Sequence, residues 1–162
     1  MNKFNQIAEF GKKLMALEKI EDSFELISDE AKQLINVQRC SIFIVDKEDG
    51  ILWTKLSDGV GRIVISIDSG IVGVTYQTGE PQVVNAPYED SRFLQNIDKK
   101  SGFVTKNIIT VPIFDSNREI IGIIQLLNKS ISDFNDKDLK TLKFFANYVS
   151  GSMELVLINT KQ

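Results

Sequence analysis

The sequence predicts an α+β fold, because segments with the composition of β-strands lie between two helical ends and are mostly joined as hairpins. At both ends of the chain, apolar residues recur at steps of three and four, which is the spacing of an amphipathic helix. Between these ends, short runs rich in β-branched and aromatic residues are separated by turn residues. A chain of 162 residues, 43% of them hydrophobic, is long enough for one domain with one core.

Two helices are expected in the first 36 residues. Asp22, with Glu25 three positions later, resembles an N-terminal cap and its partner, so the break between the helices should fall near 18–22. We therefore interpret 1–20 as an N-terminal helix that could join two subunits, and 21–162 as the main domain, including a long C-terminal helix. The two apolar stripes are Phe4, Ile7, Phe10, Leu14 and Leu17, and Ile20, Phe24, Ile27, Ala31 and Leu34.

The next part of the chain should form strands around one inserted helix. A hairpin with Gly50 in its turn comes first, and a third strand follows. The inserted helix should end at Gly79, where a left-handed residue is needed, shortly before Pro81. The expected elements are strands at 39–46, 51–57 and 62–67, a short helix within 69–81 and a short strand at 82–85.

A long polar connection with aromatic residues follows over 86–107, and connections of this length in compact domains are usually functional or mobile. It leads to a second hairpin, with strands at 108–115 and 119–129 around the turn 116–118. Pro112 lies inside the first of these strands. Because proline cannot donate a hydrogen bond to a sheet, this strand is expected at an edge or interrupted there.

A long helix is expected from about Asp136, and its apolar residues define two faces. One face has the spacing of a heptad seam, and the other lies beside it. One stripe is enough to dock on a sheet, whereas two favour additional contact with a second helix, from this chain or from another subunit. A single wide core-facing stripe is the alternative. The seam is Leu139, Leu142, Ala146, Val149, Met153 and Val156, and the neighbouring set is Phe145, Tyr148, Leu155 and Leu157.

The composition excludes several kinds of site. The chain has no histidine and one cysteine, Cys40, so a His-assisted nucleophile, a His-ligated haem, a His-containing zinc site and an internal disulfide cannot form within it. A formal charge of −3 and scattered basic residues argue against a nucleic-acid partner. No stretch approaches the roughly 18 apolar residues of a membrane span, so no membrane partner is expected. The single cysteine and the lack of a signal-peptide pattern favour a cytoplasmic location.

Four segments occur in one order with familiar gaps: RCSIFIVD, GIVGVTYQTGEPQVVN, SRFLQNIDKKSGFVTKNIITVPI, and REIIGIIQLLNK followed by Phe134 and Asp138. Together they resemble a GAF domain, the small-ligand sensor module of cyclic-nucleotide phosphodiesterases, adenylyl cyclases and many bacterial signalling proteins. The resemblance covers about 21–158. It implies a six-stranded antiparallel sheet with helices on both faces, N- and C-terminal helices packed together, and a ligand pocket over one face of the sheet.

The resemblance also implies an ion pair beside the pocket. Cyclic-nucleotide-binding members carry Asn-Lys, then Phe, then Asp-Glu, and Asn128, Lys129, Phe134 and Asp138 match this pattern, whereas Leu139 replaces the final Glu. Lys129 and Asp138 are expected to pair without touching the ligand. The alternative is simple capping, in which Asn135 and Asp138 stabilise the start of the last helix, and the two interpretations are compatible.

The implied ligand-binding residues come from several segments. The backbone amides of Ile71 and Val72, at a helix start, match the site of a cyclic phosphate, although Ser-Gly before a helix is more often a plain helix start. Asp58 matches a residue that contacts the base, with a turn as the alternative, and Ser57 replaces an aromatic there. The remaining matches are Asp98, Ser101 and Thr105 in the long connection, where Leu94 replaces an aromatic, and Ser41 and Gln125, which interrupt otherwise apolar strands.

The sequence therefore predicts a non-catalytic regulatory domain that binds a small molecule, with a cyclic nucleotide as one candidate, no required cofactor and no metal site. It should act as a homodimer through its terminal helices, with an output domain outside this chain. A ligand-free dimerisation or protein-interaction module is the alternative. An enzyme is not expected: similar proteins that reduce free methionine sulfoxide need several cysteines, and only Asp58 and Asp98 could form a catalytic carboxylate pair.

Overall fold

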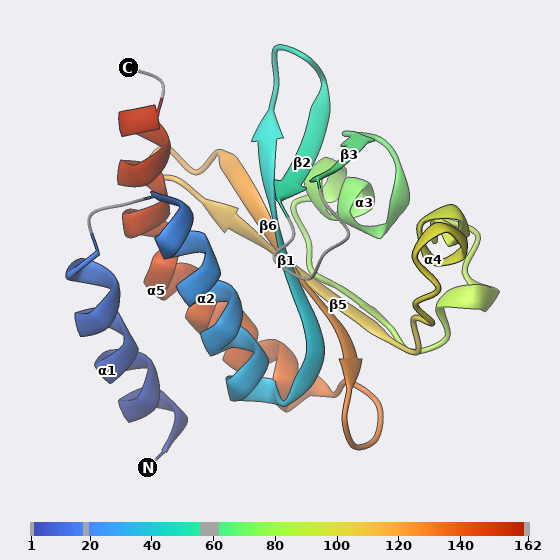
Figure 1. The fold of residues 1–162 in the computed structure, drawn as a ribbon, viewed down its shortest axis with the longest axis horizontal. Helices are drawn as coiled ribbons and strands as arrows, with labels where there is room; N and C mark the ends of the chain where they lie inside the picture. The colour runs from blue at the N-terminus through green and yellow to red at the C-terminus, as the bar shows by residue number, and fades with distance from the viewer. Residues whose placement is uncertain (1, 18–19, 56–61, 161–162) are drawn as a thin grey trace.

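A computed structural model describes residues 2–17, 20–55 and 62–160. It contains an antiparallel sheet of six strands in the order β3-β2-β1-β6-β5-β4, with helices on both faces (Figure 1). This arrangement confirms the predicted α+β class and the six-stranded antiparallel sheet. The elements are α1 (Lys3–Met15), α2 (Ile20–Ile35), β1 (Val37–Asp46), β2 (Ile51–Lys55), β3 (Arg62–Ser66), α3 (Gly70–Thr78), β4 (Gln82–Val84), the 3₁₀ turn η1 (Pro87–Glu89), α4 (Gln95–Ser101), β5 (Ile108–Phe114), β6 (Ile120–Lys129) and α5 (Asp136–Thr160).

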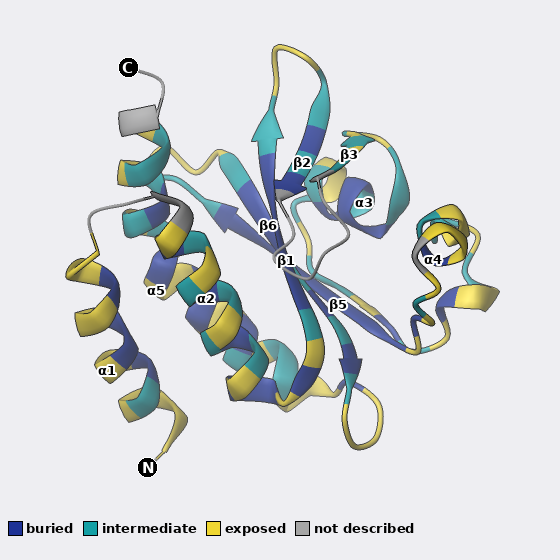
Figure 2. Cartoon of the chain, in the orientation of Figure 1, coloured by how far each residue is buried: buried dark blue, intermediate teal, exposed yellow. Residues whose placement is uncertain are grey.

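The sheet separates two layers of helices. α1, α2 and α5 cover one face, and α3 and α4 lie on the opposite side (Figure 1). Successive side chains of a strand point to opposite faces, so β1 contributes to both layers. Cys40 and Ile42 belong to the main core with α1, α2 and α5, whereas Phe43 packs with Val72 of α3. Figure 2 shows buried residues concentrated in the strands and on the inner sides of the helices.

α1 packs against α5 and α2 of the same chain. Phe10 and Phe145 are buried, with ring centroids 5.4 Å apart. Gly11 lets α1 approach Tyr148 of α5 closely, because a Cβ atom at this position would lie 2.2 Å from the Tyr148 hydroxyl oxygen. The second apolar face of α5 is therefore covered in part by a helix of this chain, one of the two arrangements that the sequence left open. Tyr148 and Leu155 of that face remain exposed.

β5 is not an edge strand of the sheet, so the first of the two alternatives expected for Pro112 is wrong for the strand as a whole. β5 lies between β6 and β4, but β4 pairs only with the residues from Ile108 to Thr110. Pro112 pairs with Ile123 of β6 and lies beyond the end of β4, so its missing N–H removes no hydrogen bond between β4 and β5. Because β4 is short, Pro112 has no strand to pair with on that side, as it would at the edge of a sheet.

The connection 86–107 contains two short helical elements that the sequence did not predict. η1 begins at Pro87, and α4 ends at Gly102, whose φ of 72° lies in the left-handed region that glycine adopts readily. We call residues 86–107 the covering segment, because they lie over the sheet face opposite α1, α2 and α5 (Figure 1). Among the described residues, no helix is both long enough and apolar enough to cross a membrane.

Candidate ligand-binding site

A cavity lies between the sheet, α3 and the covering segment. It encloses about 80 Å³, and the empty space rises to about 700 Å³ when the open mouth and the adjoining solvent are counted. Within the described ranges, no group of three or more His, Cys, Asp or Glu side chains is placed to hold a metal ion. The lining residues are mostly apolar: Arg39, Ser41, Phe43, Ile63, Ile65, Gly70, Ile71, Val72, Phe93, Leu94, Ile97, Asp98, Phe103, Thr105, Ile108, Gln125 and Leu127.

Most of the residues that the sequence proposes for ligand binding meet at this cavity. It is lined by Ser41, Ile71, Val72, Asp98, Thr105 and Gln125. Ser101 lies in the last turn of α4, but its side chain is outside the described part of the structure. Asp58 and Ser57 also fall outside the described residues. The ligand contacts of all these residues remain predictions.

A row of polar side chains begins in the floor of the cavity with Ser41 and Gln125 and continues beneath α3 with Thr110. Ser41 of β1 pairs in register with Gln125 of β6, and Gln125 pairs with Thr110 of β5. Residues directly opposite in an antiparallel sheet share a face, so the three side chains lie side by side. The hydroxyl oxygens of Thr110 and Thr75, in α3, are 2.6 Å apart, and both residues are fully buried. This hydrogen bond fixes α3 over the polar row.

The start of α3 is covered by the segment that closes the cavity. Gly70 has a φ of 72°, and Ser69 makes no side-chain capping hydrogen bond. A Cβ atom at Gly70 would lie 3.0 Å from Leu94 Cδ1, so glycine allows Leu94 to pack directly over the first turn. A ligand group that approaches the Ile71 and Val72 amides would therefore contact or displace Leu94.

Asp98 holds the covering segment together. The carboxylate is buried and accepts hydrogen bonds from the Thr105 backbone N–H and from the Thr105 hydroxyl, each at 2.9 Å. It also accepts a hydrogen bond from the Tyr88 hydroxyl. This bond raises the pKa of Tyr88, because loss of the phenol proton would remove the bond and place two negative charges together. Asp98 thus lines the cavity while it joins η1, α4 and the residues that lead into β5.

The first part of the covering segment is held by two side chains: Asn85, the residue just before it, and Arg92. Asn85 accepts a hydrogen bond from the Phe134 N–H at 2.9 Å through Oδ1 and donates one to the Phe134 carbonyl at 3.2 Å through Nδ2. Arg92 forms a two-pronged ion pair with Asp90, which lowers the pKa of that carboxyl group, and donates to Gln82 Oε1 at 3.0 Å. The segment is therefore connected to β4 and to the loop before α5.

The far end of the covering segment is fastened by Asn128. Its Oδ1 accepts hydrogen bonds from the Lys106 N–H at 2.6 Å and the Asn107 N–H at 3.4 Å. Its Nδ2 donates to the Val104 carbonyl at 2.8 Å and to Gln38 Oε1 at 3.0 Å. The φ of Asn128 is 64°, in a region that asparagine tolerates better than most residues. The asparagine of the Asn-Lys pair thus binds backbone of this chain.

Lys129 and Asp138 form an ion pair, and Asp138 also caps α5. The Lys129 Nζ lies 2.6 Å from Asp138 Oδ2, and both side chains are 14% exposed. Asp138 Oδ2 accepts a hydrogen bond from the Asn135 N–H at 3.0 Å, while Asn135 Oδ1 accepts one from the Asp138 N–H at 2.9 Å. This reciprocal pair is a capping box. The two interpretations of Asp138 are therefore both realised by one carboxylate.

A double-mutant cycle on Lys129 and Asp138 should give a coupling energy of about 1–2 kcal/mol, because the pair is largely shielded from water. The variants are Lys129→Met and Asp138→Asn, the latter of which keeps an oxygen for the cap. The exposed pair of Lys12 and Glu9, whose side chains are 78% and 58% exposed, is the control and should give about 0.5 kcal/mol or less. Equal coupling in the two cycles, measured by urea denaturation, would contradict the shielding.

Arg39 is a cavity residue that the sequence reasoning missed. It begins the same inward-facing set as Ser41 and Phe43, two and four residues further along β1. Its guanidinium carbon lies 3.8 Å from the centre of the Phe103 ring. The alternation of side chains along a strand could have identified it: Arg39 lies two positions before Ser41 and therefore faces the same side of the sheet.

The comparisons with known proteins agree with this geometry. The GAF domain family model matches residues 19–153, and the chain belongs to this family. It is 30% identical over 132 residues to a probable 3′,5′-cyclic phosphodiesterase of Caenorhabditis elegans, a match that covers 73% of this chain and 18% of the relative. It is 32% identical over 127 residues to a dual 3′,5′-cyclic-AMP and -GMP phosphodiesterase of Takifugu rubripes, covering 69% of this chain and 14% of that one. The chain thus spans less than a fifth of these relatives.

Solved structures show the same fold at lower sequence identity. The GAF domain of an Acinetobacter phosphoenolpyruvate-protein phosphotransferase superposes with a TM-score of 0.83 at 17% identity, covering 100% of this chain and 99% of that one. A free methionine-R-sulfoxide reductase from Neisseria meningitidis, in complex with its substrate, gives a TM-score of 0.78 at 15% identity, covering 97% of this chain and 91% of that chain. The fold therefore occurs in domains with different activities.

Proposed function

We propose that this chain is a non-catalytic sensor domain of a signalling protein, which binds a small molecule beneath the covering segment and relays binding through its terminal helices in a homodimer. The observation that carries the proposal is the cavity, in which polar groups converge within mostly apolar walls. A cyclic nucleotide is the first candidate ligand, because the similar relatives are named cyclic phosphodiesterases. The output domain would lie outside this chain, and the composition favours the cytoplasm.

The contacts at the two ends of the covering segment support the relay. Asn85 and Asn128 bind that segment to Phe134 and to the end of β6, and Lys129 continues the network to Asp138 in the first turn of α5. A ligand with higher affinity for the closed segment would shift the population toward closure. Closure would then bias the position of α5, because the chain between β6 and α5 is bonded to both: Phe134 contacts Asn85 beside the covering segment, and Lys129 contacts Asp138 of α5.

Catalysis is not part of the proposal. The single cysteine, Cys40, is buried and packs in the main core, whereas the cavity lies on the other face of the sheet. Asp98 lines the cavity, but its carboxylate is bonded to Tyr88 and Thr105. This arrangement favours binding over group transfer.

A ligand-free dimerisation module is the second candidate. It is favoured by exposed aromatic side chains on the outer surface of α1 and α5: Phe4 is 57% exposed, Phe144 42% and Tyr148 44%. Their rings contact one another, with the Phe4 and Phe144 centroids 4.8 Å apart. A second copy of the chain could cover this surface whether or not the cavity binds a ligand.

A thermal-shift titration against cAMP, cGMP and a panel of small metabolites tests the sensor function. A ligand at 100 times its dissociation constant should stabilise the domain by about 2.7 kcal/mol, or raise Tm by roughly 5–10 °C for a domain of this size. The same ligand should protect the covering segment from limited proteolysis, because bound ligand favours its closed position.

Two glutamine variants make the titration specific. Gln125→Leu, in the floor of the cavity, should reduce the shift, whereas Gln33→Leu, on the exposed side of α2, should leave it unchanged. If no member of the panel shifts Tm while the protein forms a stable dimer, the dimerisation module becomes the better description.

A further inference from the structure

We propose that Arg39 binds an anionic group of the ligand, so that the cavity selects small organic anions with an apolar body. This inference rests on the proposed ligand-binding function and names both the chemical class of the ligand and the residue that selects it. It is carried by the position of Arg39 in the cavity wall and by the contacts of its guanidinium group.

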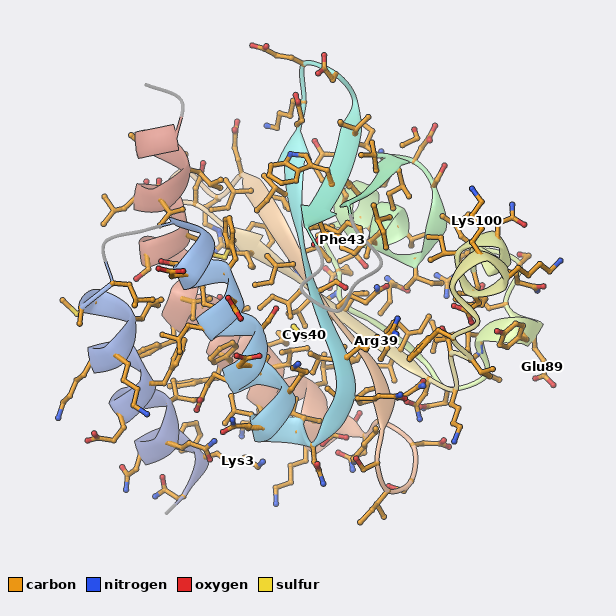
Figure 3. All side chains as sticks on the ribbon, in the orientation of Figure 1. Lys3, Arg39, Cys40, Phe43, Glu89 and Lys100 are labelled. Carbon is orange, nitrogen blue, oxygen red and sulfur yellow. The ribbon has the colours of Figure 1, made fainter. Side chains whose placement is uncertain are left out.

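Arg39 lies on the cavity face of the sheet. It pairs in register with Leu127 of β6, and both residues line the cavity. Figure 3 shows Arg39 and Phe43 on the side of β1 that faces α3 and α4. The residue is partly buried, so its charge is held at the cavity wall with restricted access to water.

The guanidinium group of Arg39 has an aromatic partner in the covering segment. It lies 3.8 Å from the centre of the Phe103 ring. Among the described residues, no carboxylate forms an ion pair with Arg39; the ion pairs of other basic residues include Arg92 with Asp90 and Lys129 with Asp138. An aromatic ring contacts the face of a guanidinium and does not satisfy the N–H donors at its edge.

This arrangement favours an anion for an energetic reason. A partly buried cation loses hydration, and a cation–π contact compensates for only part of that loss. A carboxylate or phosphate oxygen pair matches the planar fork of the guanidinium and forms charge-assisted hydrogen bonds. The apolar walls, which include Phe43, Ile65 and Ile97, would cover the rest of the molecule.

The test uses three probes that share one ring and differ in charge: benzoate, phenyl phosphate and the neutral benzamide. Dissociation constants are measured by isothermal titration at low ionic strength. We expect at least one anionic probe to bind the wild type about 10- to 100-fold more tightly than benzamide, the range expected for charge-assisted hydrogen bonds. The preferred probe distinguishes a carboxylate ligand from a phosphate ligand.

Variants of Arg39 then assign the effect. Arg39→Met should remove the preference for the anion, and Arg39→Lys should keep part of it, because the charge remains and the fork is lost. Arg118→Met is the matched control: Arg118 also lies over a ring, 5.2 Å from the centre of Phe114, but it is exposed in the hairpin between β5 and β6. This variant should bind the probes as the wild type does.

Three results would overturn the proposal: equal affinity of the wild type for benzamide and the anions, no binding of either anion at millimolar concentration, or an anion preference that survives in Arg39→Met. A metabolite that raises Tm equally in the wild type and in Arg39→Met would also reject the role of Arg39. That last result would leave the sensor function standing, so the two proposals fail in distinguishable ways.

Discussion

Replacing Phe145 with alanine should lower the free energy of unfolding by about 3–5 kcal/mol. Phe145 is fully buried in the core between the sheet and the helices α1, α2 and α5, and its ring packs against Phe10 of α1. Removing the ring leaves a cavity bounded by several elements, which cannot collapse together without moving the sheet contacts of α5. Urea denaturation followed by circular dichroism measures the change, and the m-value should stay the same.

The adjacent residue is the control for Phe145. Phe144 is 42% exposed and contacts Phe4 and Tyr148 on the outer surface of the helices. Phe144→Ala should cost much less, about 1 kcal/mol, since the residue is already 42% exposed and its removal opens no enclosed cavity. Similar losses for the two variants would contradict the orientation of α5 about its own axis, in which Phe145 faces the core and Phe144 faces outward. The comparison also shows which face of α5 stabilises a single chain.

The strands and long helices were predictable because burial on one face imposes a period. The middle of each predicted stripe is buried, with Phe10 in α1 and Ala31 in α2 as examples. The ends differ from the prediction: Phe4 is exposed, Leu17 lies beyond the end of α1, and Asp22 lies inside α2 and not at its cap. Gly79 ends α3 with a φ of 69°, the left-handed conformation that its position before Pro81 indicated. In these elements local preference and tertiary packing favour the same structure.

α4 was missed because it lacks both signals that define a helix in a sequence. It has seven residues, too few to show a period, and Leu94 at its N-terminal boundary makes no side-chain capping hydrogen bond. The position of α4 depends on Asp98. The partners of this residue, Tyr88 and Thr105, lie ten positions before Asp98 and seven positions after it. Such contacts are formed by the fold and carry no local pattern.

The site was predictable in composition and only partly in geometry. Ser41 and Gln125 were proposed from the resemblance to the GAF family, supported by their interruption of apolar strands, and both line the cavity. Thr110 and its contact with Thr75 required the register of β5 on β6, which the sequence does not specify. Arg39 was taken as part of a strand, although its spacing from Ser41 placed it on the same face.

Asn128→Ala should lower the free energy of unfolding by about 2–4 kcal/mol, because it removes one buried and two partly buried hydrogen bonds to the backbone of the covering segment and places alanine at a positive φ. The Asn128 side chain accepts from the Lys106 and Asn107 N–H groups and donates to the Val104 carbonyl. The change should also increase cleavage of the covering segment by proteases, since its far end would keep only the bonds of Asn107 to the Asn128 and Lys129 N–H groups. Urea denaturation and limited proteolysis measure the two effects on the same protein.

Two further variants separate the hydrogen bonds of Asn128 from its backbone conformation. Asn128→Gly loses the same side-chain bonds but adopts a φ of 64° without strain, so it should be more stable than Asn128→Ala by about 1 kcal/mol. Asn128→Asp keeps the oxygen that accepts from Lys106 and loses the donors to Val104 and Gln38. If both variants were as stable as the wild type, Asn128 could not be the connection between the covering segment and β6. A loss of stability without increased cleavage would separate the Asn128 side chain from the closure of the cavity. The proposed relay to α5 would then have to pass through Asn85 and Phe134, or through the bond from the Lys129 N–H to Asn107 Oδ1.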